Sequence, residues 1–420
     1  MSSLLAQPLT LPSGAVLPNR IVKAAMSEGL SDSANHATPR LTALYRRWAS
    51  SGAGLLLSGN IQVDRWHLER ANNVVLEDES GLAALREMVV AGRAHGAHFW
   101  AQLGHTGRQV DAAINSAPLA PSAVALDPIR GVASTFAPPR AMTEAEILAA
   151  IERFAVSARL AQRAGFTGVQ LHGAHGYLIS QFLSPLANRR TDRWGGSLEN
   201  RARLLLETIA AVRAAVGPQF PIGLKLNSSD FQRGGFTFEE NLQVVRWLNA
   251  TTLDLLELSG GTLEQPKMAD ISVRDEGEDG RRASTARREA YFVELAGAVR
   301  AVAAMPVMVT GGFRTRAGMI AALEAGELDL IGIGRPLIAE PGVAARLIAG
   351  EIDRLPAPEA DLFVGHLMPW FNMQLERLGD DLDPDLAMTG EAAAAAFGPL
   401  EDGNIRALVE RRAAEGRAAA

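Results

Sequence analysis

The sequence predicts an α/β fold, a closed (β/α)8 TIM barrel with an N-terminal hairpin plug and a helical C-terminal tail. Eight short runs rich in Val, Ile and Leu alternate with longer helical patterns along the chain. Each run is apolar throughout, which is typical of parallel strands buried on both faces. Polar or small residues follow each run, where such barrels form their binding sites. An open doubly wound sheet is the alternative, but no G-x-G-x-x-G loop follows the first run.

The barrel strands are expected to follow a small hairpin. Residues 9–11 and 16–17 flank the turn-forming stretch Pro12-Ser13-Gly14-Ala15, which predicts two short strands that plug one barrel end. The eight barrel strands are expected at residues 20–25, 54–58, 97–103, 168–171, 222–226, 253–258, 307–310 and 330–333. Helix starts between them are marked by capping residues: Thr38 before Pro39, Thr143 with Glu146, Ser197 after Gly195-Gly196, and Thr237 with Glu240.

Two parts of the chain are expected. Residues 1–355 form the barrel, and residues 356–420 form a helical extension that packs on it. Within the extension we expect one helix at 361–378, an acidic linker at 380–384, and an Ala- and Arg-rich end that is weakly helical or frayed. Trp370 and Phe371 are expected either to cover the pocket or to pack in a subunit contact.

The composition excludes several classes of protein. There are 41 Lys and Arg against 47 Asp and Glu, so the net charge is −6, whereas a nucleic-acid-binding surface is usually basic. The absence of cysteine excludes disulfides, thiolate zinc sites and cysteine-ligated iron–sulfur clusters. The N-terminus lacks a secretory pattern, and no apolar run is long enough to span a membrane. We therefore expect a cytoplasmic protein with no nucleic-acid or membrane partner; a homo-oligomer is left open.

The most informative segment follows the fourth expected strand. It reads Leu171-His172-Gly173-Ala174-His175-Gly176-Tyr177. Two imidazoles and a phenol within one turn suit the binding of a substrate carbonyl or anion and the delivery of a proton. The structural alternative is a polar strand-to-helix turn. Zinc is disfavoured, since no cysteine or nearby carboxylate completes a tetrahedral set, and no metal is expected.

A lysine interrupts the fifth expected strand. Burial of Lys225 would be costly without a negative partner. Its amine could form a Schiff base, as in aldolase-type barrels, or its charge could stabilise a ring that becomes anionic on reduction. The third interpretation is a side chain that extends to the barrel mouth without a chemical role.

The last two strand exits predict a phosphate site. Gly311 and Gly312 follow the seventh strand, and Gly334 and Arg335 follow the eighth. Glycines let backbone amides approach a phosphate at a helix start, and an arginine can pair with it in bidentate fashion. A phosphate site at these two exits is common in TIM barrels.

These features together resemble the Old Yellow Enzyme family of FMN-dependent NADH:flavin oxidoreductases, or ene-reductases, over residues 9–378. The matching stretches are Pro18-Asn19-Arg20-Ile21-Val22 running to Met26, Gln102-Leu103-Gly104-His105-Thr106-Gly107-Arg108, His172-Gly173-Ala174-His175-Gly176-Tyr177-Leu178, Phe182-Leu183-Ser184-Pro185, Asn188-Arg189-Arg190-Thr191-Asp192 and Trp194-Gly195-Gly196-Ser197-Leu198-Glu199-Asn200-Arg201.

The resemblance implies FMN across the barrel mouth. Its ring would contact Ala24, Ala25, Met26, Ser27, Asn60, Gln102 and Lys225, and its phosphate would contact Gly311, Gly312, Gly334 and Arg335. Lys225 would lie near N1 and O2 and stabilise the anionic reduced ring. NADH or NADPH would reduce the flavin first. His172 and His175 would then hold the oxygen of an activated alkene, hydride would pass from N5 to its β-carbon, and Tyr177 would protonate the α-carbon.

Two departures from the family pattern bear on redox tuning. Many relatives carry cysteine or threonine at Ser27 and arginine at Lys225. The absence of cysteine also disfavours the longer members with an iron–sulfur cluster, so we expect electrons to come directly from a nicotinamide. The loops 64–73 and 265–282 are expected to set the shape of the substrate pocket. Arg281 and Arg282 are expected either to meet the phosphates of a nicotinamide nucleotide or simply to be solvated. A Schiff-base aldolase that uses Lys225 and a non-catalytic barrel that binds FMN or a sugar phosphate are the alternatives.

Overall fold

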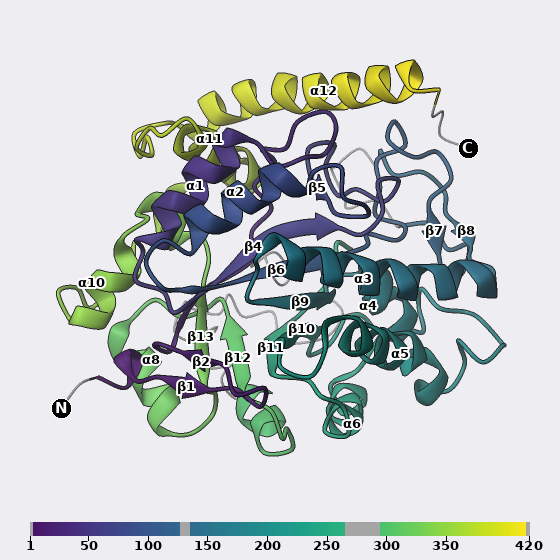
Figure 1. Cartoon of the computed structure of the whole chain (residues 1–420), viewed down its shortest axis with the longest axis horizontal. Coiled ribbons are helices and arrows are strands. Elements are labelled where there is room, and N and C mark those ends of the chain that lie inside the picture. Colours follow the sequence, from purple (N-terminus) through teal and green to yellow (C-terminus); the bar gives the residue numbers. More distant parts are fainter. Residues whose placement is uncertain (1–2, 127–134, 265–294, 417–420) are drawn as a thin grey trace.

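The computed structural model describes residues 3–126, 135–264 and 295–416. Within them, eight parallel strands form a closed barrel (Figure 1). Pairing of β13 with β3, and of β3 with β4, closes the ring, so the predicted TIM barrel is confirmed. The strands are β3 (Ile21–Lys23), β4 (Leu55–Gln62), β6 (His98–Gly104), β9 (Gly168–Gly173), β10 (Ile222–Asn227), β11 (Leu255–Ser259), β12 (Val307–Thr310) and β13 (Leu330–Ile333).

Helices surround the barrel. They are α1 (Pro39–Ala49), α2 (Leu82–Gly92), α3 (Glu144–Ala164), α4 (Leu178–Leu183), α5 (Leu198–Val216), α6 (Phe238–Leu248), α8 (Arg316–Glu324), α9 (Pro336–Ala339) and α10 (Val343–Ala349). The four predicted helix starts are confirmed. Thr38 and Ser197 cap α1 and α5, while α3 and α6 begin with complete capping boxes, in which a threonine hydroxyl and a glutamate satisfy each other's backbone amides.

Alternate residues along each strand face opposite sides of the barrel wall. On β10, Ile222, Leu224 and Leu226 belong to the large hydrophobic cluster between the strands and the helices. A second, smaller cluster lies inside the barrel, and it includes Trp100 of β6, Leu255 of β11 and Met308 of β12. Apart from Lys23 of β3, the strands therefore bury mainly apolar side chains on the helix side, but on the inner side the apolar side chains lie near the strand beginnings.

The N-terminal hairpin closes that end of the barrel, as predicted. Strands β1 (Leu9–Thr10) and β2 (Val16–Leu17) pair antiparallel. Leu11 and Leu17 are buried in the same cluster as Trp100, so the hairpin continues the inner apolar layer. The backbone N–H of Ser13 donates to Asp254 Oδ1 over 2.7 Å, which attaches the hairpin turn to the start of β11. Three further short strands lie in loops: β5 (Val74–Val75), β7 (Leu119–Ala120) and β8 (Arg140–Ala141).

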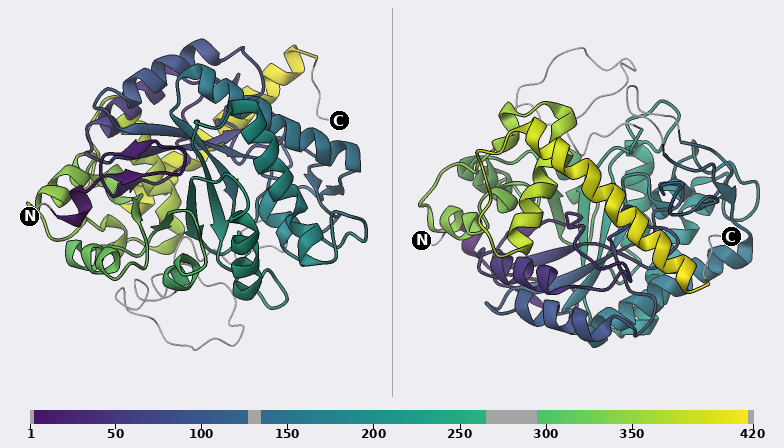
Figure 2. Two further views of the ribbon diagram at one scale, coloured as in Figure 1. Left: turned by 60° about the horizontal axis from the view of Figure 1, so that its bottom comes forward. Right: turned by 90° about the horizontal axis from the view of Figure 1, so that it is seen from above.

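The C-terminal part differs in detail from the prediction. The single helix expected at 361–378 is wrong in its first turns, because the 3-10 turns Pro358–Asp361 and Val364–His366 precede α11 (Leu367–Gly379). The end that was expected to be weakly helical or frayed contains the long helix α12 (Gly390–Ala414), which crosses the molecule on the side away from the hairpin (Figures 1 and 2). Packing on other elements stabilises helices more than propensity does, and this packing was not visible in the sequence.

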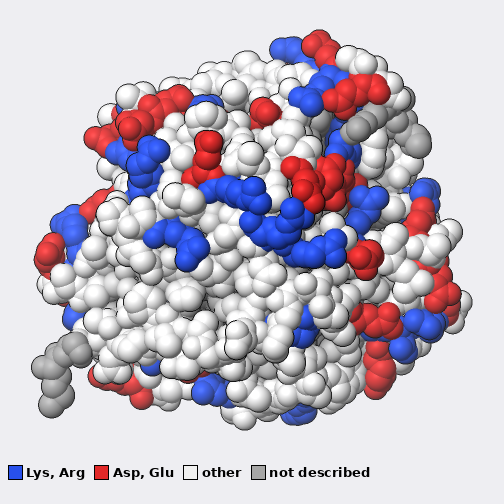
Figure 3. Space-filling model, viewed as in Figure 1, with Lys and Arg blue, Asp and Glu red and all other residues white. Residues whose placement is uncertain are grey.

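Trp370 and Phe371 lie in the large hydrophobic cluster, where they are 1% and 7% exposed. Their burial within this chain accounts for them without a subunit contact. The surface seen in Figure 3 carries Lys and Arg next to Asp and Glu across its upper half and along its right side, whereas the lower centre is largely uncharged. Among the described helices, none has the length and apolar character that crossing a membrane requires.

Candidate active site

The two predicted histidines and the tyrosine meet at the exit of β9. The ring centroids of His172 and His175 are 5.0 Å apart, and those of His172 and Tyr177 are 4.7 Å apart. His175 has a φ of 60°, in the left-handed region that non-glycine residues rarely adopt. Asn227 Oδ1 accepts from the His175 N–H and Gln109 donates to the His175 carbonyl, so neighbouring side chains hold this turn.

Both imidazoles are neutral at pH 7. Burial, followed by the nearby positive charge of Lys225, lowers the pKa of His172 and of His175 well below the usual value. His172 Nδ1 accepts a hydrogen bond from the Ala174 N–H, so the ring proton is on Nε2. His175 Nε2 lies 2.6 Å from Ser259 Oγ, which orients the second ring. His172 is thus an oriented N–H donor at the barrel mouth.

Lys225 has the negative partner that its burial requires. Its Nζ is 3.1 Å from Glu257 Oε1, and both side chains are buried. Thr310 donates to Oε1 of this carboxylate, and Gln170 donates to Oε2. Gln170 Oε1 in turn accepts from Gln102, one of the predicted flavin contacts. Glu257 and Gln170 were missed in the sequence because they lie within strands, where only apolar residues were expected.

Tyr177 contacts a carboxylate that was also missed. Glu69, in the loop between β4 and α2, accepts from Ser27 Oγ over 2.5 Å and from Asn60 Nδ2 over 2.7 Å. Burial, then the negative charge of Glu69 and its hydrogen bond to the hydroxyl, raise the pKa of Tyr177 well above 10, while Asn60 opposes the shift. Ser27, Asn60 and Tyr177, predicted separately, are therefore brought together by Glu69.

The residues expected to line the flavin ring lie at neighbouring strand exits, and one of them offers an unused hydrogen-bond acceptor. Ala24, Ala25 and Met26 follow β3, and Met26 Sδ lies next to Gly334 at the exit of β13. Asn60 Oδ1 is buried without a hydrogen-bond partner in the described part of the chain. Buried polar atoms are normally paired, so this acceptor is suited to a donor from a bound group.

The predicted phosphate site lies at two neighbouring strands, since β12 pairs with β13. Gly311 and Gly312 have φ values of 92° and 85°, which favour glycine. No described atom lies within 4 Å of a Cβ built on Gly311, so there is space beside its backbone. Arg335 is the cap of α9, and its Nε lies 3.7 Å from Glu359 Oε1. The space beside the Gly311 backbone, together with this arginine, fits a phosphate.

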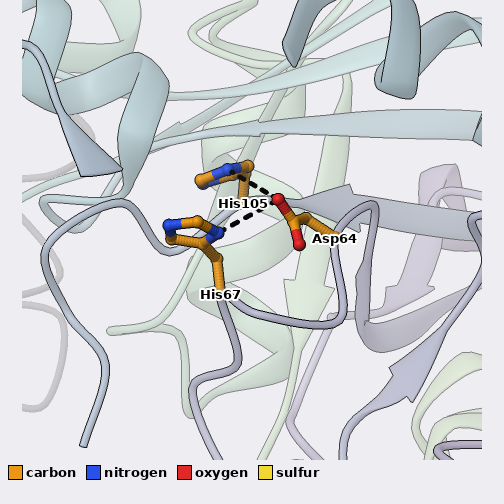
Figure 4. Close-up of side chains that lie close together, drawn as sticks. All are labelled: Asp64, His67 and His105. Atoms are coloured by element: carbon orange, nitrogen blue, oxygen red, sulfur yellow. Dashed lines mark hydrogen bonds and ion pairs between the residues drawn. The ribbon is translucent and has the colours of Figure 1, made fainter. Parts of the chain in front are cut away.

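A separate buried cluster joins Asp64, His67 and His105 (Figure 4). His67 Nδ1 and His105 Nε2 lie 3.1 and 3.7 Å from Asp64 Oδ2. The other ring nitrogens, His67 Nε2 and His105 Nδ1, accept backbone N–H groups of Leu119 and Gly107. Since a histidine binds a metal through a nitrogen lone pair, and these are already used, the cluster is a hydrogen-bonded brace and not a formed metal site.

Of the two loops expected to shape the pocket, only one can be described. The loop 64–73 carries Glu69 and lies over the exits of β3 and β4, where Ser27 and Asn60 are found. The loop 265–282, with Arg281 and Arg282, lies outside the described residues.

Comparisons with known proteins agree with this architecture. The family model described as NADH:flavin oxidoreductase / NADH oxidase matches residues 4–353. The NADH-dependent flavin oxidoreductase iliE of Hypocrea jecorina is 37% identical over 80% of this chain and 86% of its own length. A protein of the same name in Neonectria is also 37% identical over 80% of this chain, but the match spans only 46% of that protein's own length. The NADH-dependent flavin oxidoreductase nadA of Aspergillus parasiticus is 34% identical over 94% of this chain and 89% of its length.

Among solved structures, morphinone reductase superposes with a TM-score of 0.69 at 26% identity, over 86% of this chain and 93% of that one. The family match covers the whole barrel, including every residue predicted from the strand exits. The chain therefore belongs to the NADH:flavin oxidoreductase / NADH oxidase family, the Old Yellow Enzyme family that its sequence resembles.

Proposed function

We propose that this protein is an FMN-dependent NAD(P)H oxidoreductase that reduces activated C=C bonds in small molecules such as α,β-unsaturated carbonyl or nitro compounds. The single observation that carries the proposal is the cluster of His172, His175 and Tyr177 at the exit of β9. It combines hydrogen-bond donors for an oxygen with a hydroxyl that can give a proton to carbon. The names of the relatives, NADH-dependent flavin oxidoreductase and morphinone reductase, support the same class of reaction.

The strand exits would hold the cofactor. The backbone at Gly311, Gly312 and Gly334, with Arg335, would bind the phosphate, and Ala24, Ala25, Met26, Asn60 and Gln102 would line the ring. Bound FMN would supply the hydride, which it receives from NADH or NADPH. Lys225 would provide positive charge at the ring, and Glu257 would compensate that charge when the ring is neutral.

Three side chains would act on the substrate. The Nε2–H of His172 would donate to the carbonyl or nitro oxygen, and His175 would lie beside it. This hydrogen bond would draw electrons from the C=C bond of the substrate. Because both imidazoles are neutral, they would bind the oxygen without losing a proton. Tyr177 would protonate the α-carbon, and its raised pKa keeps the hydroxyl protonated at neutral pH.

The alternatives fit the geometry less well. A Schiff-base lysine attacks its substrate with a free amine, whereas Lys225 Nζ lies 3.1 Å from the buried carboxylate of Glu257. A barrel that only binds FMN or a sugar phosphate would not need a buried tyrosine between an amide and a carboxylate.

The proposal is tested on protein reconstituted with FMN. We expect flavin absorbance that NADH or NADPH bleaches without oxygen, and that a cyclic enone, a maleimide or a nitroalkene restores in stoichiometric amount. Omitting the alkene is the control, because the reduced absorbance should then persist. Failure to bind FMN would contradict the cofactor assignment, whereas bleaching that no alkene reverses would contradict the substrate class alone.

A further inference from the structure

The imidazole of His175 is hydrogen-bonded at Nε2, which lies 2.6 Å from Ser259 Oγ at the end of β11. Within the described residues, Nδ1 of the same ring has no hydrogen-bond partner. His175 is partly exposed, whereas His172 is buried. The ring of His175 is neutral at pH 7, because burial and then the charge of Lys225 lower its pKa. A neutral imidazole has a single N–H, so the proton lies on either Nδ1 or Nε2.

The exits of β10 and β11 fix the contact between Ser259 and His175. Ser259 pairs with Asn227 of β10, and its carbonyl accepts the Ser228 N–H over 2.7 Å. Asn227 Oδ1 accepts the His175 N–H over 3.1 Å, and Asn227 Nδ2 donates to the Gly261 carbonyl over 2.9 Å. One asparagine side chain therefore joins the turn that carries His175 to the turn that follows Ser259. The backbone on both sides sets the distance between the hydroxyl and the ring.

The number of available partners decides which atom donates. Ser259 is 6% exposed, and His175 Nε2 is the only partner of its hydroxyl in the described part of the chain. If Nε2–H were the donor, the hydroxyl proton of Ser259 would be buried without an acceptor. If the hydroxyl is the donor, its proton is paired and the ring proton lies on Nδ1. Buried polar groups are normally paired, which favours the second arrangement.

We propose that Ser259 is a positioning residue that sets the tautomer of His175, so that this histidine donates to the substrate through Nδ1–H. The inference rests on the proposed function, in which His172 and His175 bind the oxygen of an activated alkene. His172 has the opposite arrangement, since its Nδ1 accepts the Ala174 N–H and its proton is on Nε2. The two rings, with centroids 5.0 Å apart, therefore offer one N–H each, from different nitrogens.

The hydroxyl of Ser259 also strengthens the donor on the other side of the ring. By donating to Nε2 it draws electron density from the imidazole, so Nδ1–H becomes a better donor, and successive hydrogen bonds reinforce each other. A carbonyl or nitro oxygen can only accept a hydrogen bond. The Nε2–H tautomer would meet that oxygen with a lone pair at Nδ1 and repel it. Neither Ser259 nor His175 transfers a proton in this arrangement.

The ¹⁵N NMR spectrum of the imidazoles tests the tautomer directly. The chain has eight histidines, and His175→Asn identifies the two ring resonances of His175, since asparagine tolerates the φ of 60°. At pH 7 we expect Nδ1 to have the shift of a protonated nitrogen and Nε2 that of an acceptor. In Ser259→Ala the proton should exchange between both nitrogens, because no hydrogen bond fixes it. A proton on Nε2 in the wild-type protein, or an unchanged tautomer in Ser259→Ala, would overturn the inference.

Ser228→Ala is the matched control for this measurement. Ser228 follows β10 and is bonded to Ser259 through the backbone, but its buried hydroxyl has no hydrogen-bond partner in the described residues. The control removes a hydroxyl from the same strand exits without removing a contact of His175, so the Nδ1–H tautomer should persist. Loss of the tautomer in Ser228→Ala as well would show that it responds to any disturbance there, which would also count against Ser259.

The kinetics of the FMN-loaded enzyme show whether the hydroxyl acts through the imidazole. We expect Ser259→Ala to lower kcat/KM for an enone by roughly fivefold, as for the loss of one hydrogen bond. In a His175→Asn background the same substitution should cause no further loss, because Ser259 then has no ring to position. A further loss of similar size in the double variant would overturn the inference.

Failure of the proposed function gives a different pattern. If the wild-type protein reduced no enone, the ¹⁵N spectra would still report the tautomer, and an Nδ1–H form that Ser259→Ala abolishes would support the role of Ser259. If the wild-type protein reduced enones while the tautomer did not depend on Ser259, only the role of Ser259 would be wrong.

Discussion

The inside of the barrel has two layers of opposite character. Near the hairpin, the inner side chains are apolar: Trp100, Leu255 and Met308 pack with Leu17. Two residues further along β6, β11 and β12, the same inner face carries Gln102, Glu257 and Thr310, which are joined by hydrogen bonds through Gln170. A period of two along the strands places each set in one layer.

The difference between the layers separates stability from chemistry. The apolar cluster at the hairpin gains its stability from the removal of apolar surface from water. The mouth layer buries an ion pair, which contributes little net stability but would be costly to break. Substitutions in the first layer should therefore change unfolding alone, whereas substitutions in the second should change the reaction, and also stability where they break the ion pair.

The largest effect is expected from Trp100→Ala. The ring is fully buried and packs on Gly168 and Gly223, where no side chain would fit beside it. Its loss should lower the free energy of unfolding by about 3–5 kcal/mol, measured by urea denaturation. Val16→Ala is the control, since Val16 is half exposed in the same hairpin and should cost within about 0.5 kcal/mol. A similar loss in both variants would contradict the importance of the inner layer.

Tyr177→Phe should have the opposite profile. Removal of the hydroxyl that lies against Glu69 should slow alkene reduction by roughly 10²-fold or more, equivalent to about 2.7 kcal/mol in the barrier. Stability should change by about 1 kcal/mol or less, because a single hydrogen bond is lost. Stopped-flow measurement of the two half-reactions checks this, and a comparable slowing of flavin reduction would argue against a proton-donor role.

The sequence predicted the strands and their exits well for a physical reason. Runs such as 222–226 are recognisable because their helix-facing residues are apolar, and the exits follow directly from the ends of the runs. The cluster of His172, His175 and Tyr177 was accessible because its members are adjacent in sequence. Lys225 was noticed because it breaks the apolar pattern.

Other site residues could not be inferred in this way. Glu257 lies inside a strand, and only a period-two register across neighbouring strands would place it opposite Lys225. Glu69 lies in a loop, and its position depends on Arg70 and Glu401, which are 331 residues apart in the chain. Such a contact leaves no local pattern, and neither does the packing that makes α12 a stable helix.

A buried lysine on the outer side of the wall gives a third test. Lys23 of β3 is fully buried, donates to the Leu57 carbonyl over 2.6 Å and lies 4.2 Å from the ring centroid of Trp48. Burial lowers its pKa to about 8, against the opposing effect of Glu28. Unlike Lys225, it has no place at the mouth, so its charge should affect stability and not the reaction.

The sign of the pH dependence follows from this shift. Below pH 8 the Lys23 amine is protonated in both the folded and the unfolded protein. Between pH 8 and 10.5 the unfolded chain binds this proton and the folded protein largely does not, so the free energy of unfolding rises with pH. From pH 8 to about 9.5 the rise should be about 2 kcal/mol. Urea denaturation of Lys23→Met should lack this rise. A wild-type curve parallel to that of the variant would show that Lys23 does not titrate in this range.

The smallest effect is expected from Gly311→Ala, which tests the phosphate side of the mouth. A methyl group at Gly311 meets no described atom within 4 Å, so the cost comes from the φ of 92° and amounts to about 1–2 kcal/mol. Gly350→Ala is the matched control, because Gly350 has a φ of 76° at the end of α10, outside the strand exits that form the mouth, and only ordinary contacts around its Cβ. Both variants should lose similar stability in urea.

If the Gly311 amide faces the FMN phosphate, fluorescence titration should show weaker FMN binding, by roughly fivefold, in Gly311→Ala alone. Equal FMN affinity in the two variants would place the phosphate elsewhere, although the rest of the mouth could still hold the ring.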